Sequence, residues 1–271
     1  MLRLGPLLLP CTPVLLAAGY LLADAVAALA RARGAGDARR ALLLVLLLAL
    51  GVARASFVLR HWTDYRGLAA VFDVRDRGFD AWAGWAAGGL CVALLAWLRT
   101  SLRRSLPAAA GAGALLVLAA QAMLRLDAAP GPPLPALVLP TPDGAPLALQ
   151  HMRGQPLVVN LWATWCPPCR RELPMLVDAA RRWHGVRIVL VDQRESAAQV
   201  RDYLRAAGLR PPLLGLDAQG ALASRYRAPG LPTTLFFAAD GSLQRMYVGE
   251  LSAATLAQGI RTLRDAGDRP R

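Results

Sequence analysis

The chain has 271 residues, of which 55% are hydrophobic and 18% are charged. Soluble proteins carry roughly 25% charged residues, so this composition argues against an ordinary soluble protein. The net charge of +13 comes from arginines that lie between apolar segments or are scattered along the chain, without interleaved aromatic residues. We therefore expect no nucleic-acid partner. The four cysteines are too few and too dispersed for a disulfide scaffold or a zinc site.

Four apolar stretches precede residue 126, and each approaches the ~20 residues that a helix needs to span a bilayer. They are Leu7–Ala30, Ala41–Leu59, Ala81–Leu98 and Pro107–Leu124. A cleaved signal peptide would account only for the first stretch, which is also too long for the apolar region of such a peptide. We therefore predict an α-helical membrane domain over residues 1–125, with about four transmembrane helices embedded in the lipid bilayer.

The connectors between these stretches predict the orientation of the domain. The first and third connectors are rich in arginine, whereas the connector from Arg60 to Asp80 balances four arginines with four aspartates. Because arginine-rich connectors face the cytoplasm, the N-terminus and everything after residue 125 are expected outside. The Ala-, Gly-, Pro- and Arg-rich composition is typical of a GC-rich bacterial genome, so we expect a bacterial inner-membrane protein with its C-terminal part in the periplasm. Asp24 and Arg54 fall inside predicted spans, where a charge needs a compensating environment.

A proline-rich segment, residues 126–135, reads as a semi-rigid linker. In residues 136–271 the pattern becomes an alternation of strands and helices. Strands are expected at Leu157–Trp162, Val186–Asp192, Leu235–Ala238 and Gln244–Val248, the last two joined by the Asp240-Gly241 turn. Helices are expected at Glu172–Trp183, Ala197–Ala207 and Leu251–Ala266.

The sequence Trp165-Cys166-Pro167-Pro168-Cys169 follows the first of these strands. Two cysteines three positions apart can close and reopen a disulfide, which is two-electron chemistry that needs no bound cofactor. Cys166 is the candidate nucleophile, because the dipole and free amides of a helix N-terminus favour its thiolate. Cys169, one turn further in and more buried, is the candidate resolving thiol. A static disulfide is the alternative, and no metal is expected.

Val158–Pro174 and Gly230–Phe237 resemble the membrane-anchored bacterial thioredoxin-like reductases of the TlpA/ResA type. The resemblance covers about residues 134–266. It rests on an apolar strand, the WCxxC motif, a Glu three residues after the second Cys, and a later Pro-Thr pair before another apolar strand. It implies a thioredoxin-like α/β fold and a protein-disulfide reductase. Client proteins would be apocytochrome c thiols, a disulfide isomerase or a peroxide-handling thiol protein, and a membrane or periplasmic donor would supply electrons.

The same resemblance assigns further site residues. It implies a cis bond at Leu231-Pro232 facing the cysteines, where the preceding backbone would pair with a substrate; a turn proline is the alternative. Glu172 is implied to tune the protons of the cysteines, against the alternative of an ordinary acid in the first turn of a helix. Asn160 stands where cytosolic thioredoxins carry a buried aspartate. The residues expected to contact the substrate are Trp165, Pro167, Leu231 and Thr233.

Two alternative functions involve the membrane domain. Cys11 and Cys91 resemble the intramembrane cysteines of transmembrane reductant conductors and would relay electrons to the CxxC pair, unless they are simply small apolar side chains. Gly51–Leu90 resembles prolipoprotein diacylglyceryl transferase, although the His of that family's Gly-rich segment is missing. In a lipid-modifying protein with an accessory redox domain, the important residues would be Arg54, Tyr65 and Arg66. The client, the electron donor and the net direction of exchange stay open.

Overall fold

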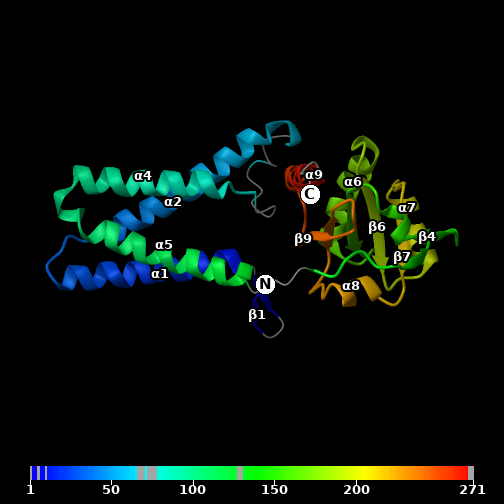
Figure 1. Ribbon diagram of the computed structural model, residues 1–271, viewed down its shortest axis with the longest axis horizontal. Helices are drawn as coiled ribbons and strands as arrows, with labels where there is room; N and C mark the ends of the chain where they lie inside the picture. Colours follow the sequence, from blue (N-terminus) through cyan, green and yellow to red (C-terminus); the bar gives the residue numbers. More distant parts are fainter. Residues whose placement is uncertain are drawn as a thin grey trace. The chain divides into compact units, whose positions relative to one another are not determined.

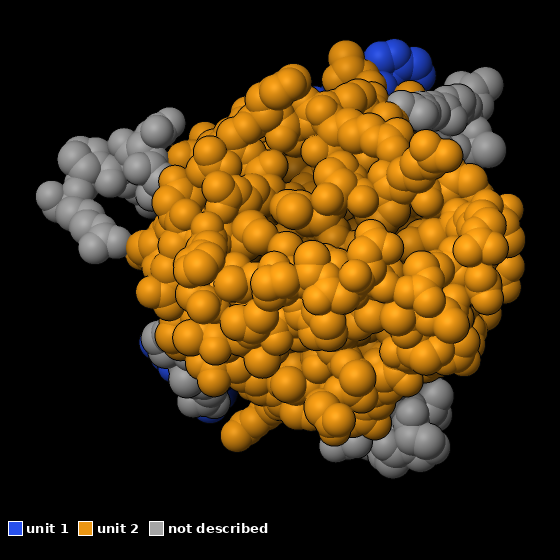
Figure 2. Space-filling model, turned by 90° about the vertical axis from the view of Figure 1, so that its right-hand side faces the viewer, with its two compact units in different colours: residues 1–62, 78–129 blue, residues 63–77, 130–271 orange. Residues whose placement is uncertain are grey.

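The computed structural model describes residues 2–4, 7–9, 11–65, 71, 78–126 and 131–267. The chain divides into two compact units (Figures 1 and 2). Unit 1 comprises residues 1–62 and 78–129, and unit 2 comprises residues 63–77 and 130–271.

Unit 1 contains four long helices, which confirms the predicted helical membrane domain. They are α1 (Cys11–Ala32), α2 (Arg39–Arg60), α4 (Ala81–Leu98) and α5 (Ser105–Leu126). By length and composition, all four are able to cross a membrane. Short 3₁₀ turns at Trp62–Asp64 and Thr100–Leu102 follow α2 and α4.

The predicted start of the first helix, at Leu7, is wrong. Leu7–Leu9 forms a short strand, β2, that pairs antiparallel with β1 (Leu2–Leu4), and α1 begins only at Cys11. Pro13 lies in the first turn of α1, where an amide hydrogen would have no partner within the helix, so the proline is tolerated there. The apolar run from Leu7 thus changes from strand to helix within one predicted span.

The helices of unit 1 pack in the pairs α1 with α5 and α2 with α4. A Cβ atom at Gly19 would lie 2.6 Å from Val117 Cγ2 and 3.0 Å from the Gly113 carbonyl oxygen, so glycine here favours the close approach of α1 and α5. The two charges predicted within spans have partners. Asp24 accepts two hydrogen bonds of 2.7 Å from Arg39, and Arg54 donates to the Gly78 carbonyl at 2.8 Å.

Unit 2 is built on a five-stranded mixed sheet with the order β7-β6-β5-β8-β9. The strands are β5 (Leu157–Trp162), β6 (Arg187–Gln193), β7 (Leu214–Asp217), β8 (Thr233–Phe237) and β9 (Leu243–Val248). The first three are parallel, whereas β8 runs antiparallel to β5 and β9 antiparallel to β8. This topology confirms the predicted thioredoxin-like α/β fold.

Helices cover the sheet, and β5 contributes to a core on each of its faces. Val158 and Trp162 belong to the core that includes Leu173 and Leu176 of α6, whereas Val159 and Leu161 face the opposite core. The helices are α6 (Pro167–Arg182), α7 (Ala197–Ala206), α8 (Ala221–Arg225) and α9 (Ala253–Gly267) (Figure 1). A hairpin of β3 (Val138–Pro140) and β4 (Pro146–Ala148), followed by a 3₁₀ turn at Leu149–Met152, precedes β5.

Residues 131–135, which the sequence places at the end of a linker, are attached to unit 2. Leu134 is buried, and its N–H donates to the Gly241 carbonyl at 2.8 Å. The Tyr226 hydroxyl donates to the Pro133 carbonyl at 3.0 Å. Residues 127–130 of the predicted linker lie outside the described residues.

Candidate functional site

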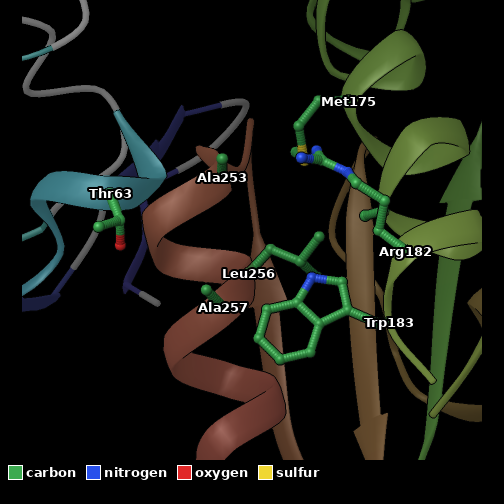
Figure 3. A pocket seen from close by; sticks show the side chains of 8 residues that line it. Thr63, Met175, Arg182, Trp183, Ala253, Leu256 and Ala257 are labelled. Atoms are coloured by element: carbon green, nitrogen blue, oxygen red, sulfur yellow. The ribbon is translucent and has the colours of Figure 1, made fainter. Parts of the chain in front are cut away.

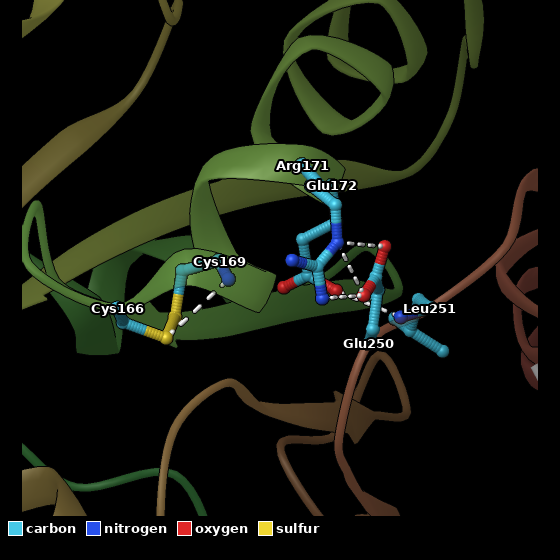
Figure 4. A network of polar contacts seen from close by, with 6 residues as sticks. All are labelled: Cys166, Cys169, Arg171, Glu172, Glu250 and Leu251. Carbon is cyan, nitrogen blue, oxygen red and sulfur yellow. Dashed lines mark hydrogen bonds and ion pairs between the residues drawn. A yellow bond between two sulfur atoms is a disulfide. The ribbon is translucent and has the colours of Figure 1, made fainter. Parts of the chain in front are cut away.

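A disulfide joins Cys166 and Cys169 at the N-terminus of α6 (Figure 4). Cys166 is the N-cap of this helix. Pro167 and Pro168 follow in the first turn, where their lack of an amide hydrogen leaves no helical bond unmade. The first backbone N–H that the helix offers is therefore that of Cys169, and it donates to Cys166 Sγ at 3.3 Å.

Both cysteines are buried in this oxidised state. Cys166 is 3% exposed and Cys169 is fully buried, in the order expected for a nucleophile and a resolving thiol. Trp165, immediately before the pair, is 67% exposed, and Pro167 is exposed as well. A partner that approaches the disulfide therefore meets these two side chains beside it.

The segment that carries Leu231, Pro232 and Thr233 lies at the same end of the sheet. Thr233 at the start of β8 is opposite Leu161, next to the end of β5 from which the cysteine turn emerges. The Leu231-Pro232 peptide bond is cis, as the resemblance implies. Pro232 is buried, Leu231 is half-buried, and the Thr233 hydroxyl donates to the Gly230 carbonyl at 2.6 Å.

Glu172 lies one helical turn after Cys169, with its carboxylate buried beneath α6 (Figure 4). One carboxylate oxygen accepts a hydrogen bond of 2.8 Å from Asn160 Nδ2, and the other accepts one of 2.7 Å from the Leu251 N–H. Asn160 also donates to Thr234 Oγ1 at 3.0 Å, so it links β5, β8 and α6. This arrangement differs from that of an ordinary solvated acid in a first turn.

Burial raises the pKa of Glu172 to about 7. The hydrogen bonds from Leu251 and Asn160 favour the carboxylate and lower its pKa, but they do not offset desolvation, and nearby Glu250 raises the pKa further. Glu172 can therefore take up or release a proton near neutral pH, one turn from the resolving cysteine.

Arg171, next to Glu172, pairs with Glu250 on the outer side of this network (Figure 4). The guanidinium donates to both oxygens of the Glu250 carboxylate, at 2.6–3.1 Å. Because Glu250 precedes Leu251, the ion pair and the buried hydrogen bond connect α6 to the same short segment before α9. No local pattern predicts this pair, since its two residues lie 79 positions apart.

A second group that sequence reasoning missed lies beneath the turn before the cysteines. Glu195 accepts hydrogen bonds from both the N–H and the hydroxyl of Thr164, and Asp192 accepts one from the N–H of Glu195. One feature of the sequence could have indicated this group: Asp192 lies near the end of an apolar strand, and the ends of parallel strands gather polar side chains at one edge of a sheet.

The residues of the two membrane-based alternatives are described only in part. Cys91 is a half-buried free thiol, and Tyr65 is half-buried. The side chain of Cys11 and the whole of Arg66 lie outside the described residues. No group of three or more His, Cys, Asp or Glu side chains that could hold a metal ion occurs in the described part of the chain.

A hollow of about 340 Å³ on unit 2 lies apart from the cysteines (Figure 3). It is lined mainly by side chains of α6, of α9 and of Trp183, which follows α6. These residues are Met175, Ala179, Arg182, Trp183, Ala253, Leu256 and Ala257. Since neither cysteine and no predicted site residue lines it, the hollow is not part of the redox site.

Comparison with known proteins places the matching region in the C-terminal half. Residues 130–246 match the model of the AhpC/TSA family. Thiol-disulfide oxidoreductase ResA of Bacillus subtilis (strain 168) is 27% identical over 128 residues, which are 46% of this chain and 71% of the relative. Sporulation thiol-disulfide oxidoreductase A of the same organism is 29% identical over 133 residues, 47% of this chain and 79% of the relative.

A solved structure, that of a thioredoxin-family thiol:disulfide interchange protein from Chlorobium tepidum TLS, is 29% identical. It covers 51% of this chain and 98% of its own, with a TM-score of 0.44. The two oxidoreductases bear out the resemblance to the TlpA/ResA type. The resemblance of Gly51–Leu90 to diacylglyceryl transferase has no support from these matches.

Proposed function

We propose that this chain, whose C-terminal unit is an AhpC/TSA thioredoxin-family domain, is a membrane-anchored thiol-disulfide oxidoreductase that reduces disulfides of client proteins. The observation that carries the proposal is the Cys166–Cys169 disulfide at the N-cap of α6. A helix N-terminus stabilises a thiolate, which is the reactive form in disulfide exchange. The redox centre is the cysteine pair itself, and no further cofactor takes part.

The reaction begins with the reduced pair. The Cys166 thiolate attacks one sulfur of a client disulfide, forming a mixed disulfide, and the other client sulfur leaves as a thiolate that takes up a proton. Cys169 then loses its proton and attacks Cys166 Sγ, which releases the second client sulfur. Two electrons have passed from the pair to the client, and the Cys166–Cys169 disulfide has formed. Glu172 is the buried group that we assign to receive the Cys169 proton, directly or through water.

Substrate contact is assigned to the surface around the disulfide. Exposed Trp165 and Pro167 lie on one side, and Leu231, Pro232 and Thr233 lie at the end of the neighbouring strand β8. The proposed clients are proteins with accessible disulfides or thiols, with apocytochrome c as one candidate. A membrane or periplasmic thiol donor then returns electrons to the pair, because no local thioredoxin system is expected outside the cytoplasm.

The membrane half supplies the anchor. We assign residues 1–125 to the bacterial inner membrane, residues 126–135 to the connection, and residues 136–271 to a thioredoxin-like domain in the periplasm. The supports are the four apolar helices and the arginine-rich first and third connectors. Disulfides are common in that compartment, so the pair meets substrates there.

The in-cell redox state of Cys166 and Cys169 tests both the direction and the location. Intact cells are treated with a membrane-impermeant maleimide, and the modified cysteines are located by mass spectrometry. A periplasmic reductase predicts that most of the pair is reduced and labelled. A pair that is mostly oxidised, and labelled only after a reductant is added, would identify an oxidase. Labelling only after the inner membrane is permeabilised would contradict the proposed location.

A further inference from the structure

The turn before the cysteines is held by a single carboxylate. Thr164 lies two residues before Cys166, and both of its hydrogen-bond donors contact Glu195. The Thr164 N–H donates to Oε2 at 2.5 Å, and the Thr164 hydroxyl donates to Oε1 at 2.5 Å. Glu195 is only 8% exposed. Hydrogen bonds of this kind, from neutral donors to a buried carboxylate, are short and strong. Glu195 therefore fixes the backbone and the side chain of one turn residue at once.

A second buried carboxyl group, that of Asp192, accepts a hydrogen bond from Glu195. Asp192 is fully buried near the end of β6, in register with Trp162 of β5. Its Oδ1 accepts a hydrogen bond of 3.2 Å from the Glu195 N–H. Among the described residues, no N–H or hydroxyl group donates to Asp192 Oδ2. That oxygen is the position for a proton on Asp192.

The protonation state follows from these contacts. Asp192 and Glu195 are both buried, and a hydrogen bond joins the Glu195 N–H to Asp192 Oδ1, so ionising both carboxyl groups carries a large cost. Both oxygens of Glu195 accept hydrogen bonds from Thr164, whereas Asp192 Oδ2 accepts none among the described residues, so the proton belongs on Asp192. Burial and the neighbouring Glu195 accordingly raise the pKa of Asp192.

Other charged groups nearby are engaged elsewhere. Asp217 on β7 accepts bonds from the Ala221 and Leu222 N–H groups and from Gln193 Nε2. On α6, the Arg170 guanidinium lies over the Tyr203 ring, 5.5 Å from its centre. Within the part of the chain that the structure describes, no arginine forms an ion pair with Asp192 or Glu195. The pair thus acts on the turn through hydrogen bonds.

We propose that Asp192 and Glu195 are positioning residues for Cys166: Glu195 holds Thr164 through both carboxylate oxygens, and Asp192 holds Glu195 through the Glu195 backbone N–H. The consequence is local. The Cys166 N–H donates a hydrogen bond to the Ala163 carbonyl at 3.2 Å within the same turn. Cys166 Sγ accepts a hydrogen bond from the Cys169 N–H at 3.3 Å. If Thr164 is released, the turn can move and Cys166 loses its place at the helix N-terminus, where its thiolate is stabilised.

The direction in which the Cys166 thiol pKa moves in Glu195→Gln distinguishes a positioning role of Glu195 from a purely electrostatic one. Removing the negative charge of Glu195 would by itself favour the Cys166 thiolate and lower the thiol pKa. Releasing the turn would instead raise it. Thr164→Val removes the hydroxyl donor without changing any charge, so it is the matched variant. Asp192→Asn keeps an oxygen for the Glu195 N–H and has an N–H donor in place of the proton on Asp192, so it is the conservative variant.

The test measures the alkylation rate of Cys166 against pH in the reduced full-length protein in detergent, resolved by mass spectrometry. We expect Glu195→Gln and Thr164→Val each to raise the Cys166 thiol pKa by about half a unit and to slow alkylation at pH 7 about threefold. Asp192→Asn should match the parent protein. An unchanged or lowered thiol pKa in Glu195→Gln, or an Asp192→Asn variant as impaired as Glu195→Gln, would overturn the proposal.

The proposal deepens the proposed function, because a well-placed Cys166 matters for exchange with clients, but its test does not depend on a client. Alkylation reports on the cysteine alone. A protein that reduces no client disulfide and still shows the predicted shifts would contradict the function and leave the positioning role intact. Near-UV circular dichroism identifies a variant that fails to fold, and Thr164→Val, with its small change in shape, then decides the outcome.

Discussion

Glu172 Oε2 accepts a hydrogen bond of 2.7 Å from the backbone N–H of Leu251, a residue 79 positions further along the chain. The bond ties the redox helix α6 to the segment that leads into α9. Asn160 Nδ2 donates to the other carboxylate oxygen of Glu172, so both oxygens of this buried carboxylate have hydrogen-bond donors. Burial still outweighs these bonds and places the pKa of Glu172 at about 7.

Glu172→Gln should remove part of the pH dependence of stability. The pKa of Glu172 is raised in the fold, from 4.5 to about 7, so the unfolded chain releases this proton first. Its contribution is fully present below pH 4.5 and is lost as the pH rises to about 7, a change of about 3 kcal/mol in the free energy of unfolding. Urea unfolding of the intact protein in detergent at pH 4.5 and pH 8 measures the difference. Equal pH dependence in the parent protein and the variant would refute this role.

Pro168→Ala should make Cys166 more acidic. The helix offers Cys166 Sγ one donor, the Cys169 N–H at 3.3 Å, because the two prolines supply none. An N-cap side chain accepts from the second and third helical residues, so an amide at position 168 adds a donor. We expect the Cys166 thiol pKa to fall by about half a unit.

Pro167→Ala is the matched control, because the amide of the first helical residue does not reach the N-cap side chain. Alkylation rates against pH measure both variants. Equal shifts in the two variants would show that the change comes from a looser turn and not from the added donor.

Arg171→Ala should have a small effect on stability despite the two-oxygen contact with Glu250. The Arg171 side chain is 50% exposed, and ion pairs in contact with water contribute little. We expect a loss of less than about 1 kcal/mol in the free energy of unfolding. A larger loss would mean that the pair shields the buried Glu172 network from water.

The Asp24–Arg39 pair should matter for the membrane unit. Asp24 in α1 accepts two hydrogen bonds of 2.7 Å from Arg39, the first residue of α2, and both helices are long and apolar enough to cross a membrane. Arg39→Ala leaves a carboxylate without this partner in an apolar setting, whereas Asp24→Asn combined with Arg39→Gln removes both charges. We expect the single variant to give less monodisperse protein after gentle detergent extraction than the double variant. Size-exclusion chromatography compares them, and equal yields would argue that the pair has no role in folding.

Much of the fold followed from local patterns, and much of the site did not. β5 was predicted with its observed bounds because five of its six residues are apolar. Strand β7 was missed because Leu214–Asp217 is short and contains a glycine. The helix after the cysteines was predicted to begin at Glu172, yet α6 begins at Pro167, since proline is favoured in a first turn.

The site residues divide in the same way. The CxxC pair is local in sequence and was identified directly, and Glu172 was selected because the resemblance to the TlpA/ResA type assigns it a role near the cysteines. The partners of Glu172, and the hold of Glu195 on Thr164, join residues 12 to 79 positions apart. Contacts over such separations depend on strand order and register, which a single sequence does not specify.

Trapping tests the central claim, exchange through Cys166, most directly. Without Cys169 the mixed disulfide with a client cannot resolve, so Cys169→Ala expressed in cells should accumulate partners joined to Cys166. These adducts should disappear on reduction and be absent from a variant that lacks both cysteines. Mass spectrometry of the adducts identifies the clients. The account predicts protein partners bound through Cys166; recovery of none, with Cys166 also unreactive towards alkylation, would contradict it.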